Sequence, residues 1–247
     1  MHNTTILMGG VAGLAMVSVS GAADLRVPDE FPTVQSAIDA ASDGDTILVA
    51  PGVYYESFAP DGVEVTIRST DGPEVTIFDG SELVDESIVD LSFFDGENTV
   101  IEGLTFRNGT GSWYLGQNVG GAIFALGSDA VIRDCIFHDH FVEGNGGAIS
   151  AYASDLRIEG CLFRDNVART GDGGAAIATN GGADCLILNC VFIRNDAVFF
   201  GGAINNLGAD PVIANCLFIG NEAAMGGAVR NSGADPVIVN CTFLGNQ

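Results

Sequence analysis

The chain has 247 residues and a formal net charge of −23, from 32 acidic residues and nine arginines, with no lysine. Nucleic acids and anionic lipid surfaces are bound by basic surfaces, so this balance argues against either as a partner.

Residues 1–23 have the pattern of a secretory signal peptide. Residues 6–19 are apolar but too short to span a bilayer comfortably, and the small residues 20–23 offer a cleavage site. The absence of Lys or Arg before the apolar run departs from that pattern, and a buried N-terminal strand is the alternative. No second long apolar segment follows, so we expect a secreted or cell-surface protein whose mature chain has no transmembrane segment.

Residues 24–247 show no linker, and we interpret them as a single domain. Residues 24–56 predict a cap and a first coil, with a strand at 46–50. A short helix capped by Thr33 would place four apolar residues on one face that covers the end of the stack: Val34, Ala37, Ile38 and Ala41.

Residues 57–119 predict irregular coils, with strands at 63–68, 74–78 and 87–93. Residues 97–108 already resemble half of the repeat that follows.

Residues 120–247 repeat themselves with a period of about 25 to 29 residues, which is typical of a solenoid. Each copy opens with a glycine pair and closes with Cys-x-Phe. The glycine pairs begin at Gly120, Gly146, Gly173, Gly201 and Gly226. The cysteines are Cys135, Cys161, Cys190, Cys216 and Cys241.

The residue before each cysteine is Asp, Gly or Asn, which are the types that tolerate a left-handed backbone. These residues are Asp134, Gly160, Asn189, Asn215 and Asn240. Each copy therefore predicts three short strands with a left-handed turn before the cysteine. Strands that recur in a fixed order stack in parallel about 4.8 Å apart. The fold class predicted is all-β: a right-handed parallel β-helix solenoid with an N-terminal capping helix.

The Gly-Gly-Ala-Ile and Phe-x-x-Asn segments resemble the repeats of chlamydial polymorphic outer-membrane proteins. More broadly, the chain resembles the right-handed parallel β-helix, or pectin-lyase-like, superfamily. The Arg-x-Pro-x-x-Arg segment of pectate lyases and the Gly-His-Gly motif of polygalacturonases are both missing. The resemblance therefore implies a fold and no particular activity.

Five of the six cysteines share one inward column, and only Cys185 stands outside it. We expect buried thiols that act as small hydrophobes rather than disulfides or a metal site.

A second column, six residues before the cysteine, is entirely aspartate. It can collect Ca²⁺ on a row of carboxylates or cap turns by accepting backbone N–H groups, and we favour capping. We therefore expect no cofactor, with Ca²⁺ as the alternative. The residues are Asp129, Asp155, Asp184, Asp210 and Asp235.

Two further groups are candidates for function. His138 and Asp139 point outward beside Arg164 and Asp165, where they could abstract a proton α to a uronate carboxylate. The alternative is that these are exposed strand residues, with His140 in the position that asparagine fills elsewhere. Aromatic residues in the loops before the glycine pairs could stack on sugar rings or fold back over a neighbouring coil. They are Trp113, Tyr114, Phe141, Phe199 and Phe200.

The leading interpretation is a non-catalytic secreted or cell-surface protein that is adhesin-like or binds carbohydrate. The alternative is an acidic-polysaccharide lyase or a glycoside hydrolase, against which the strong acidity counts. The partner would be a polysaccharide or a cell-surface component. Because the sequence stops at Gln247 with no capping segment, we expect that it is a fragment of a longer stack or that a partner subunit covers its end. Expressed alone, the chain should self-associate through that end.

Overall fold

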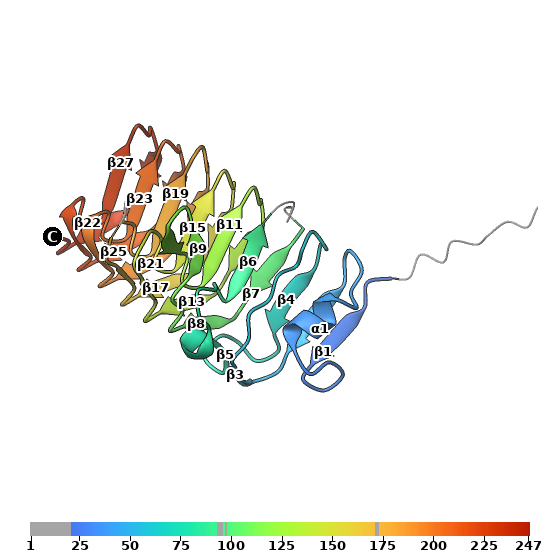
Figure 1. The fold of residues 1–247 in the computed structure, drawn as a ribbon. Coiled ribbons are helices and arrows are strands. Elements are labelled where there is room, and N and C mark those ends of the chain that lie inside the picture. The colour runs from blue at the N-terminus through green and yellow to red at the C-terminus, as the bar shows by residue number, and fades with distance from the viewer. Residues whose placement is uncertain (1–20, 93–95, 97, 171–172) are drawn as a thin grey trace, which may run out of the picture.

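The computed structural model describes residues 21–92, 96, 98–170 and 173–247. In these residues short strands stack into an elongated parallel β-helix with a helix at its N-terminal end (Figure 1). The signal peptide predicted at residues 1–23 lies almost entirely outside the described residues. No helix in the described residues is long and apolar enough to cross a membrane.

The capping helix is confirmed as α1 (Val34–Ile38). The Thr33 hydroxyl accepts a hydrogen bond from the Ser36 backbone N–H at 3.1 Å, which satisfies one of the free donors of the first turn. Val34, Ala37 and Ile38 are buried against the first coil. A single 3₁₀ turn, η1 (Gly80–Glu82), interrupts the irregular coils.

The strands of the described residues form four parallel sheets and one antiparallel two-stranded sheet. Sheet 1 contains β1 (Asp24–Val27), β2 (Thr46–Val49), β4 (Thr66–Ser69), β7 (Val100–Glu102), β12 (Val131–Arg133), β16 (Arg157–Glu159), β20 (Leu186–Leu188), β24 (Val212–Ala214) and β28 (Val237–Val239). Sheet 2 contains β3 (Gly52–Tyr54), β5 (Thr76–Asp79), β8 (Thr105–Arg107), β13 (Ile136–His138), β17 (Leu162–Arg164), β21 (Val191–Ile193), β25 (Leu217–Ile219) and β29 (Thr242–Leu244).

Sheet 3 starts at the glycine pairs and contains β6 (Val89–Ser92), β11 (Ile123–Leu126), β15 (Ile149–Tyr152), β19 (Ile177–Asn180), β23 (Ile204–Leu207) and β27 (Val229–Ser232). Sheet 4 contains β14 (Phe141–Val142), β18 (Val167–Ala168), β22 (Asp196–Phe200) and β26 (Glu222–Met225). The sequence predicts loops for the segments of sheet 4, and this prediction is wrong. They are strands because small side chains such as Ala168 and Ala197 pack beneath them against Ala175.

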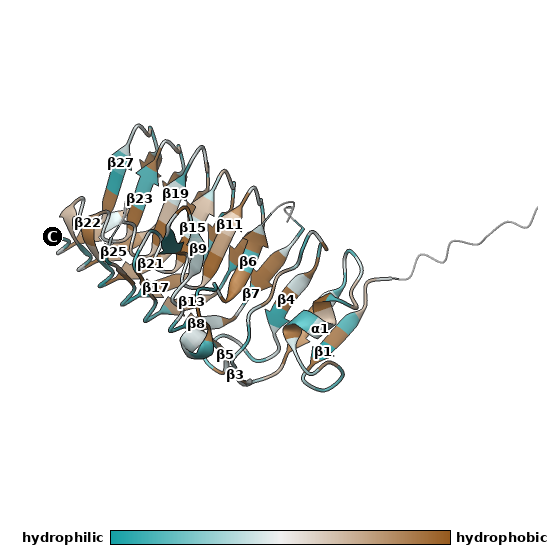
Figure 2. Ribbon diagram, viewed as in Figure 1, coloured by the Kyte–Doolittle hydropathy of each residue, from teal (hydrophilic) through white to brown (hydrophobic). Residues whose placement is uncertain are grey.

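The inward columns stack in the predicted register (Figure 2). Phe137 pairs with Phe163, and Phe163 with Phe192. The ring centroids in these pairs are 4.8 and 5.0 Å apart and the rings are within 7° of parallel. Each ring is fully buried, so the column removes a large apolar area from water with one residue type per coil.

The predicted left-handed column is confirmed, with φ between 52° and 65° from Asp134 to Asn240. The sequence does not predict a second left-handed column, which follows each strand of sheet 2 from β8 onward. Its described members have φ between 51° and 62°: Asn108, Asp139, Asp165, Arg194, Gly220 and Gly245. Each of these coils therefore turns at two left-handed residues, and one residue of the second column is an arginine, which sequence preference does not predict.

A ladder of buried asparagines follows the second turn. The Asn166 side-chain amide donates to the Phe137 carbonyl at 3.2 Å and to the Asn195 Oδ1 at 2.9 Å. Asn195 and Asn221 repeat the same contacts one coil later. The amides of this ladder are thus satisfied by the adjacent coils, which avoids the cost of leaving them unpaired in the core.

The cysteines of the described residues are all free thiols, as expected. Each column sulfur lies 3.1–3.3 Å from the carbonyl oxygen two residues before it. Burial raises the pKa of Cys161 and raises that of Cys185 to about 12, so these thiols remain protonated and unreactive.

The first left-handed turn can be tested at Asn215, which is exposed and has φ 57°. Asn215→Val should lower the free energy of unfolding by about 1–2 kcal/mol, because a β-branched residue is strained at positive φ. Asn215→Gly should be nearly neutral. Chemical unfolding followed by circular dichroism measures both, and equal losses for the two variants would contradict the turn.

Candidate functional site

A β-hairpin interrupts the regular coils and forms one wall of the main pocket. It consists of β9 (Ser112–Tyr114) and β10 (Gln117–Val119). The ring of Tyr114 lies 5.0 Å from Phe124 and 5.1 Å from Tyr152, which anchors the hairpin on sheet 3. Of the two aromatic candidates here, Tyr114 therefore packs back onto the coils. Trp113 is 63% exposed and pairs with Asn118, so both side chains leave the same face of the hairpin.

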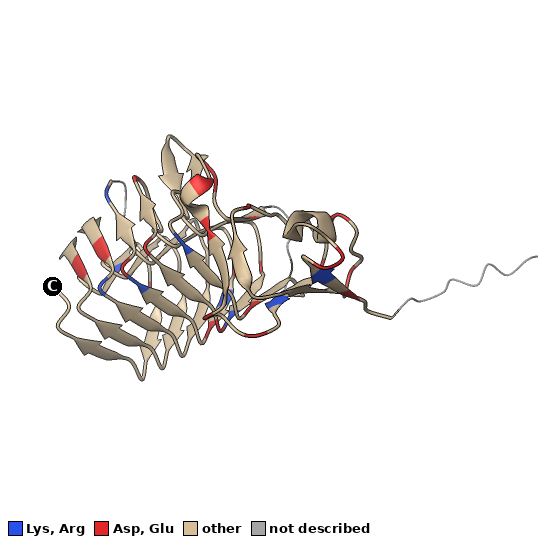
Figure 3. Cartoon of the chain, turned by 90° about the horizontal axis from the view of Figure 1, so that it is seen from below, with Lys and Arg blue, Asp and Glu red and all other residues tan. Residues whose placement is uncertain are grey.

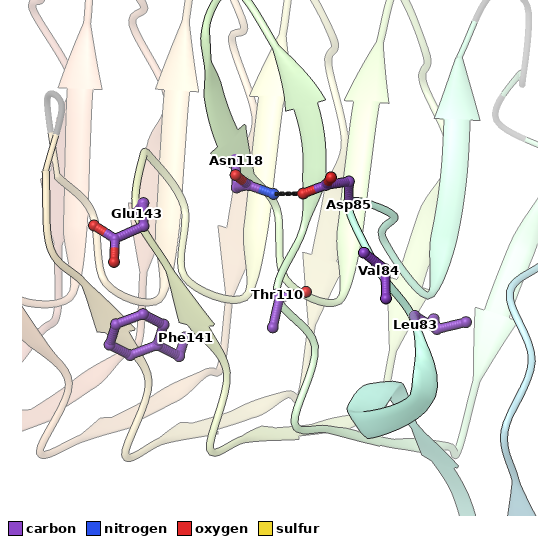
Figure 4. Close-up of a pocket in the computed structure, with 7 residues that line it drawn as sticks. All are labelled: Leu83, Val84, Asp85, Thr110, Asn118, Phe141 and Glu143. Carbon is purple, nitrogen blue, oxygen red and sulfur yellow. Dashed lines mark hydrogen bonds between the residues drawn. The ribbon is translucent and has the colours of Figure 1, made fainter.

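The pocket beside this hairpin has a volume of about 370 Å³. Figure 4 shows Phe141 of β14 and Glu143 on one side and the segment after η1 on the other, with Thr110 and Asn118 between them. The lining residues are Leu83, Val84, Asp85, Thr110, Asn118, Phe141 and Glu143. The side chain of Phe141 is 43% exposed. A sugar-sized ligand would therefore meet an aromatic ring on one side and carboxylate, amide and hydroxyl groups on the others.

The Asn118 side chain fixes the polar side of the pocket. Its amide nitrogen donates to Asp85 Oδ1 at 3.0 Å and to the Gly111 carbonyl at 3.1 Å. Asp85 has φ 55°, a left-handed conformation that aspartate tolerates better than most residues. The hairpin and the segment after η1 are thus joined by a hydrogen bond at the pocket itself.

Sequence reasoning found Phe141 but missed the other lining residues. Except for Glu143, they come from residues before the regular repeats, and their proximity depends on how the irregular coils stack. The only sequence signal was the long interval between Asn108 and Gly120, which exceeds that of the following coils.

Phe199 and Phe200 lie on β22, away from this pocket. The Arg230 guanidinium stacks 3.9 Å above the ring of Phe200, so this ring is covered by a neighbouring coil. Phe199 is 48% exposed. The five predicted aromatics therefore do not form one continuous surface.

A smaller pocket of about 170 Å³ lies on the outer face of sheet 2. His138 lies between Arg107 and Arg164 in the strand register, and its Nδ1 is 2.7 Å from Asp139 Oδ2. The structure thus brings His138, Asp139 and Arg164 together and adds Glu74, which sequence reasoning missed. The lining residues are Glu74, Ile77, Thr105, Ile136, His138, Leu162 and Arg164.

Asp165, the fourth predicted member of this group, lies in an ion-pair network. Arg164 and Arg194 contact its carboxylate at 3.2 and 2.9 Å. Burial raises the pKa of Asp165, but the hydrogen bonds from Arg194 and Arg164 outweigh it, so the pKa lies below its usual value. Asp165 is therefore held as an ionised partner of two arginines. Both it and Asp139 are also left-handed turn residues, which alone explains their residue type.

The aspartate column makes the capping contacts that the sequence favours. Asp155 Oδ1 accepts from the Asp184 backbone N–H at 2.9 Å, and Asp184 Oδ1 accepts from that of Asp210 at 2.8 Å. The same contact joins Asp129 to Asp155 and Asp210 to Asp235. Among the described residues, no group of three or more His, Cys, Asp or Glu side chains is placed to hold a metal ion.

His140 is fully buried at the start of the asparagine ladder. Its Nδ1 accepts the Gly109 backbone N–H at 3.0 Å, so its Nε2 carries the proton and donates to the Phe106 carbonyl at 3.0 Å. A neutral imidazole thus reproduces two contacts of Asn166, whose amide donates to the Phe137 carbonyl and accepts the backbone N–H of His140. Burial lowers the pKa of His140 to about 3.

The fold relates the chain to known proteins. A family model described as "Right handed beta helix region" matches residues 61–247. Two crystal structures of the pectin methylesterase from Aspergillus niger, in deglycosylated and penultimately deglycosylated forms, are similar, with TM-scores of 0.52 and 0.53. Each is 15% identical and covers 92% of this chain and 87% of its own, so the likeness shows the fold alone. A search of curated proteins finds no match.

The buried imidazole predicts a pH dependence of stability. The folded-state pKa of about 3 lies below the ordinary value of 6.5, so between these pH values the unfolded chain binds a proton that the folded chain excludes. The free energy of unfolding should therefore fall as the pH drops, by about 3 kcal/mol from this group between pH 6.5 and about pH 4.

The matched variant is His140→Asn, which can make both contacts without titrating. It should fold at neutral pH and lose less stability on acidification than the native chain, as measured by urea unfolding. Identical pH slopes for the two proteins would contradict this account of His140.

Proposed function

The chain belongs to the family of right-handed β-helix regions, and we propose that it is a secreted or cell-surface β-helix that binds carbohydrate without transforming it. The observation that carries this proposal is the pocket between the hairpin and β14. It offers the exposed ring of Phe141 beside fixed hydrogen-bonding groups, which is the combination that sugar rings require.

The sequence supports placement outside the cell. Residues 1–23 have the features of a signal peptide, and the repeats resemble those of chlamydial polymorphic outer-membrane proteins. An adhesin-like protein presents a rigid scaffold and a local binding surface. The stacked coils supply such a scaffold, and the hairpin supplies a surface that projects from it.

Removing aromatic surface at the pocket should weaken carbohydrate binding. Phe141→Ala removes a lining ring, and Trp113→Ala removes the exposed ring paired with the lining residue Asn118. Each should reduce affinity by about three- to tenfold for a glycan identified on an array, because each loses a stacking surface. Isothermal titration calorimetry measures the affinities, and thermal unfolding should show nearly unchanged melting temperatures for both variants.

Phe199→Ala is the matched control, since it removes an exposed ring outside the pocket. It should bind like the native protein. An equal loss in all three variants, or an array without any bound glycan, would contradict carbohydrate binding at this pocket.

A second candidate function is cleavage of an acidic polysaccharide at the sheet 2 pocket, favoured by the short contact between His138 and Asp139. Asp139 would orient the imidazole through Nδ1 and leave Nε2 to remove the proton α to a uronate carboxylate. Arg164 would pair with that carboxylate. The overall charge of −23 opposes binding of such a polymer.

A release assay on polygalacturonate and alginate, with and without Ca²⁺, separates this candidate from a binding role. If the site is catalytic, His138→Ala should abolish product formation, whereas Arg133→Ala on sheet 1 should retain it. Activity retained by His138→Ala would reject the site, and an inactive native protein would leave binding as the better account.

A further inference from the structure

The hairpin pocket has an acidic lining. Asp85 and Glu143 contribute carboxylates, and no arginine is among the lining residues. Arg169 is not a lining residue, but its guanidinium lies over the Phe141 ring, 5.8 Å from the ring centre, and is 3.9 Å from the Asp196 carboxylate. A uronate would therefore enter a site that holds two negative charges and no lining cation.

The two carboxylates retain capacity for a ligand. Asn118 donates to one oxygen of Asp85, and the contacts of the described residues engage neither its second oxygen nor the Glu143 carboxylate. Since Asn118 also bonds to the Gly111 carbonyl, Asp85 is held on a fixed element. Both groups are acceptors that favour a cationic donor such as an ammonium group.

The remaining lining residues favour a sugar over a simple polyamine. Leu83, Val84 and Phe141 form apolar sides, with Val84 81% exposed. Thr110 and Asn118 supply hydroxyl and amide groups that can pair with sugar hydroxyls. A ligand that fits has an apolar ring face, hydroxyl groups and a positive charge.

We propose that the pocket recognises an amino sugar with a free ammonium group, as in an oligosaccharide of de-N-acetylated glucosamine. This inference rests on the proposed carbohydrate-binding function and specifies its ligand class. Asp85 and Glu143 lie on opposite sides of the pocket (Figure 4), so each carboxylate pairs with the ammonium group of a different glucosamine unit, while Phe141 packs against a sugar ring.

Calorimetry on the full chain at low salt tests this with β-1,4-linked hexamers of glucosamine and of N-acetylglucosamine and with an α-1,4-linked hexamer of galacturonate. The glucosamine hexamer should bind most tightly, the galacturonate hexamer should not bind, and added NaCl should weaken binding of the glucosamine hexamer.

Asp85→Asn and Glu143→Gln should each lower affinity for the glucosamine hexamer about tenfold and leave affinity for the acetylated hexamer nearly unchanged. Asparagine tolerates the left-handed backbone at position 85, so Asp85→Asn removes charge without straining the turn.

Glu222→Gln, which removes an exposed carboxylate on β26 outside the pocket, is the control and should bind normally. If the glucosamine and N-acetylglucosamine hexamers bind equally well and Phe141→Ala weakens both, the amino-sugar inference is overturned but the proposed function is kept. If spermidine binds as tightly as the glucosamine hexamer, and Asp85→Asn but not Phe141→Ala weakens its binding, the inference and the proposed function are both overturned. Absence of binding to any of the hexamers would overturn the inference, and the glycan array would then decide the proposed function.

Discussion

In-register stacking of inward side chains is the constraint on which the structure depends. Each coil buries its apolar and amide groups only against the coils on either side, so every column must repeat a compatible residue. The Phe137–Phe163 ring stack is an apolar example of such a column, and the Asn166–Asn195 amide contact is a polar one. His140 fits the polar column although it is not an asparagine, because a neutral imidazole has one acceptor and one donor in the positions where the column needs them.

This constraint limits where a specific site can arise. Outward positions of the later coils carry residues such as Leu186 and Val212, and Figure 3 shows long stretches of the C-terminal sheets without charged residues. Apolar, acidic and amide side chains come together instead where the repeat is interrupted, at the segment after η1 and at the β9–β10 hairpin. The hairpin can project because Tyr114 anchors it on sheet 3, and the pocket forms in the space that it encloses.

The fold could be predicted from the sequence because residues that stack on one another recur at a regular spacing. The cysteine column, the phenylalanine two residues after each cysteine and the left-handed turn at Asn215 are all predicted in this way. The second left-handed turn was not, since Arg194 occupies it in one coil. The two-residue strand at β14 is too short to leave a periodic pattern. Of the site, Phe141 was predicted. Asp85 and Asn118 were not, because they are 33 residues apart and meet only through the path of the irregular coils.

The central claim is that a sugar ligand binds beside the hairpin. Trp113 is the single tryptophan of the chain and leaves the same hairpin face as Asn118, so its emission reports on this site without labelling. Titration with the glucosamine hexamer should shift and change the intensity of that emission in a saturable way, with the same affinity that calorimetry gives. Saturable binding by calorimetry with unchanged tryptophan emission would place the ligand elsewhere and contradict the account.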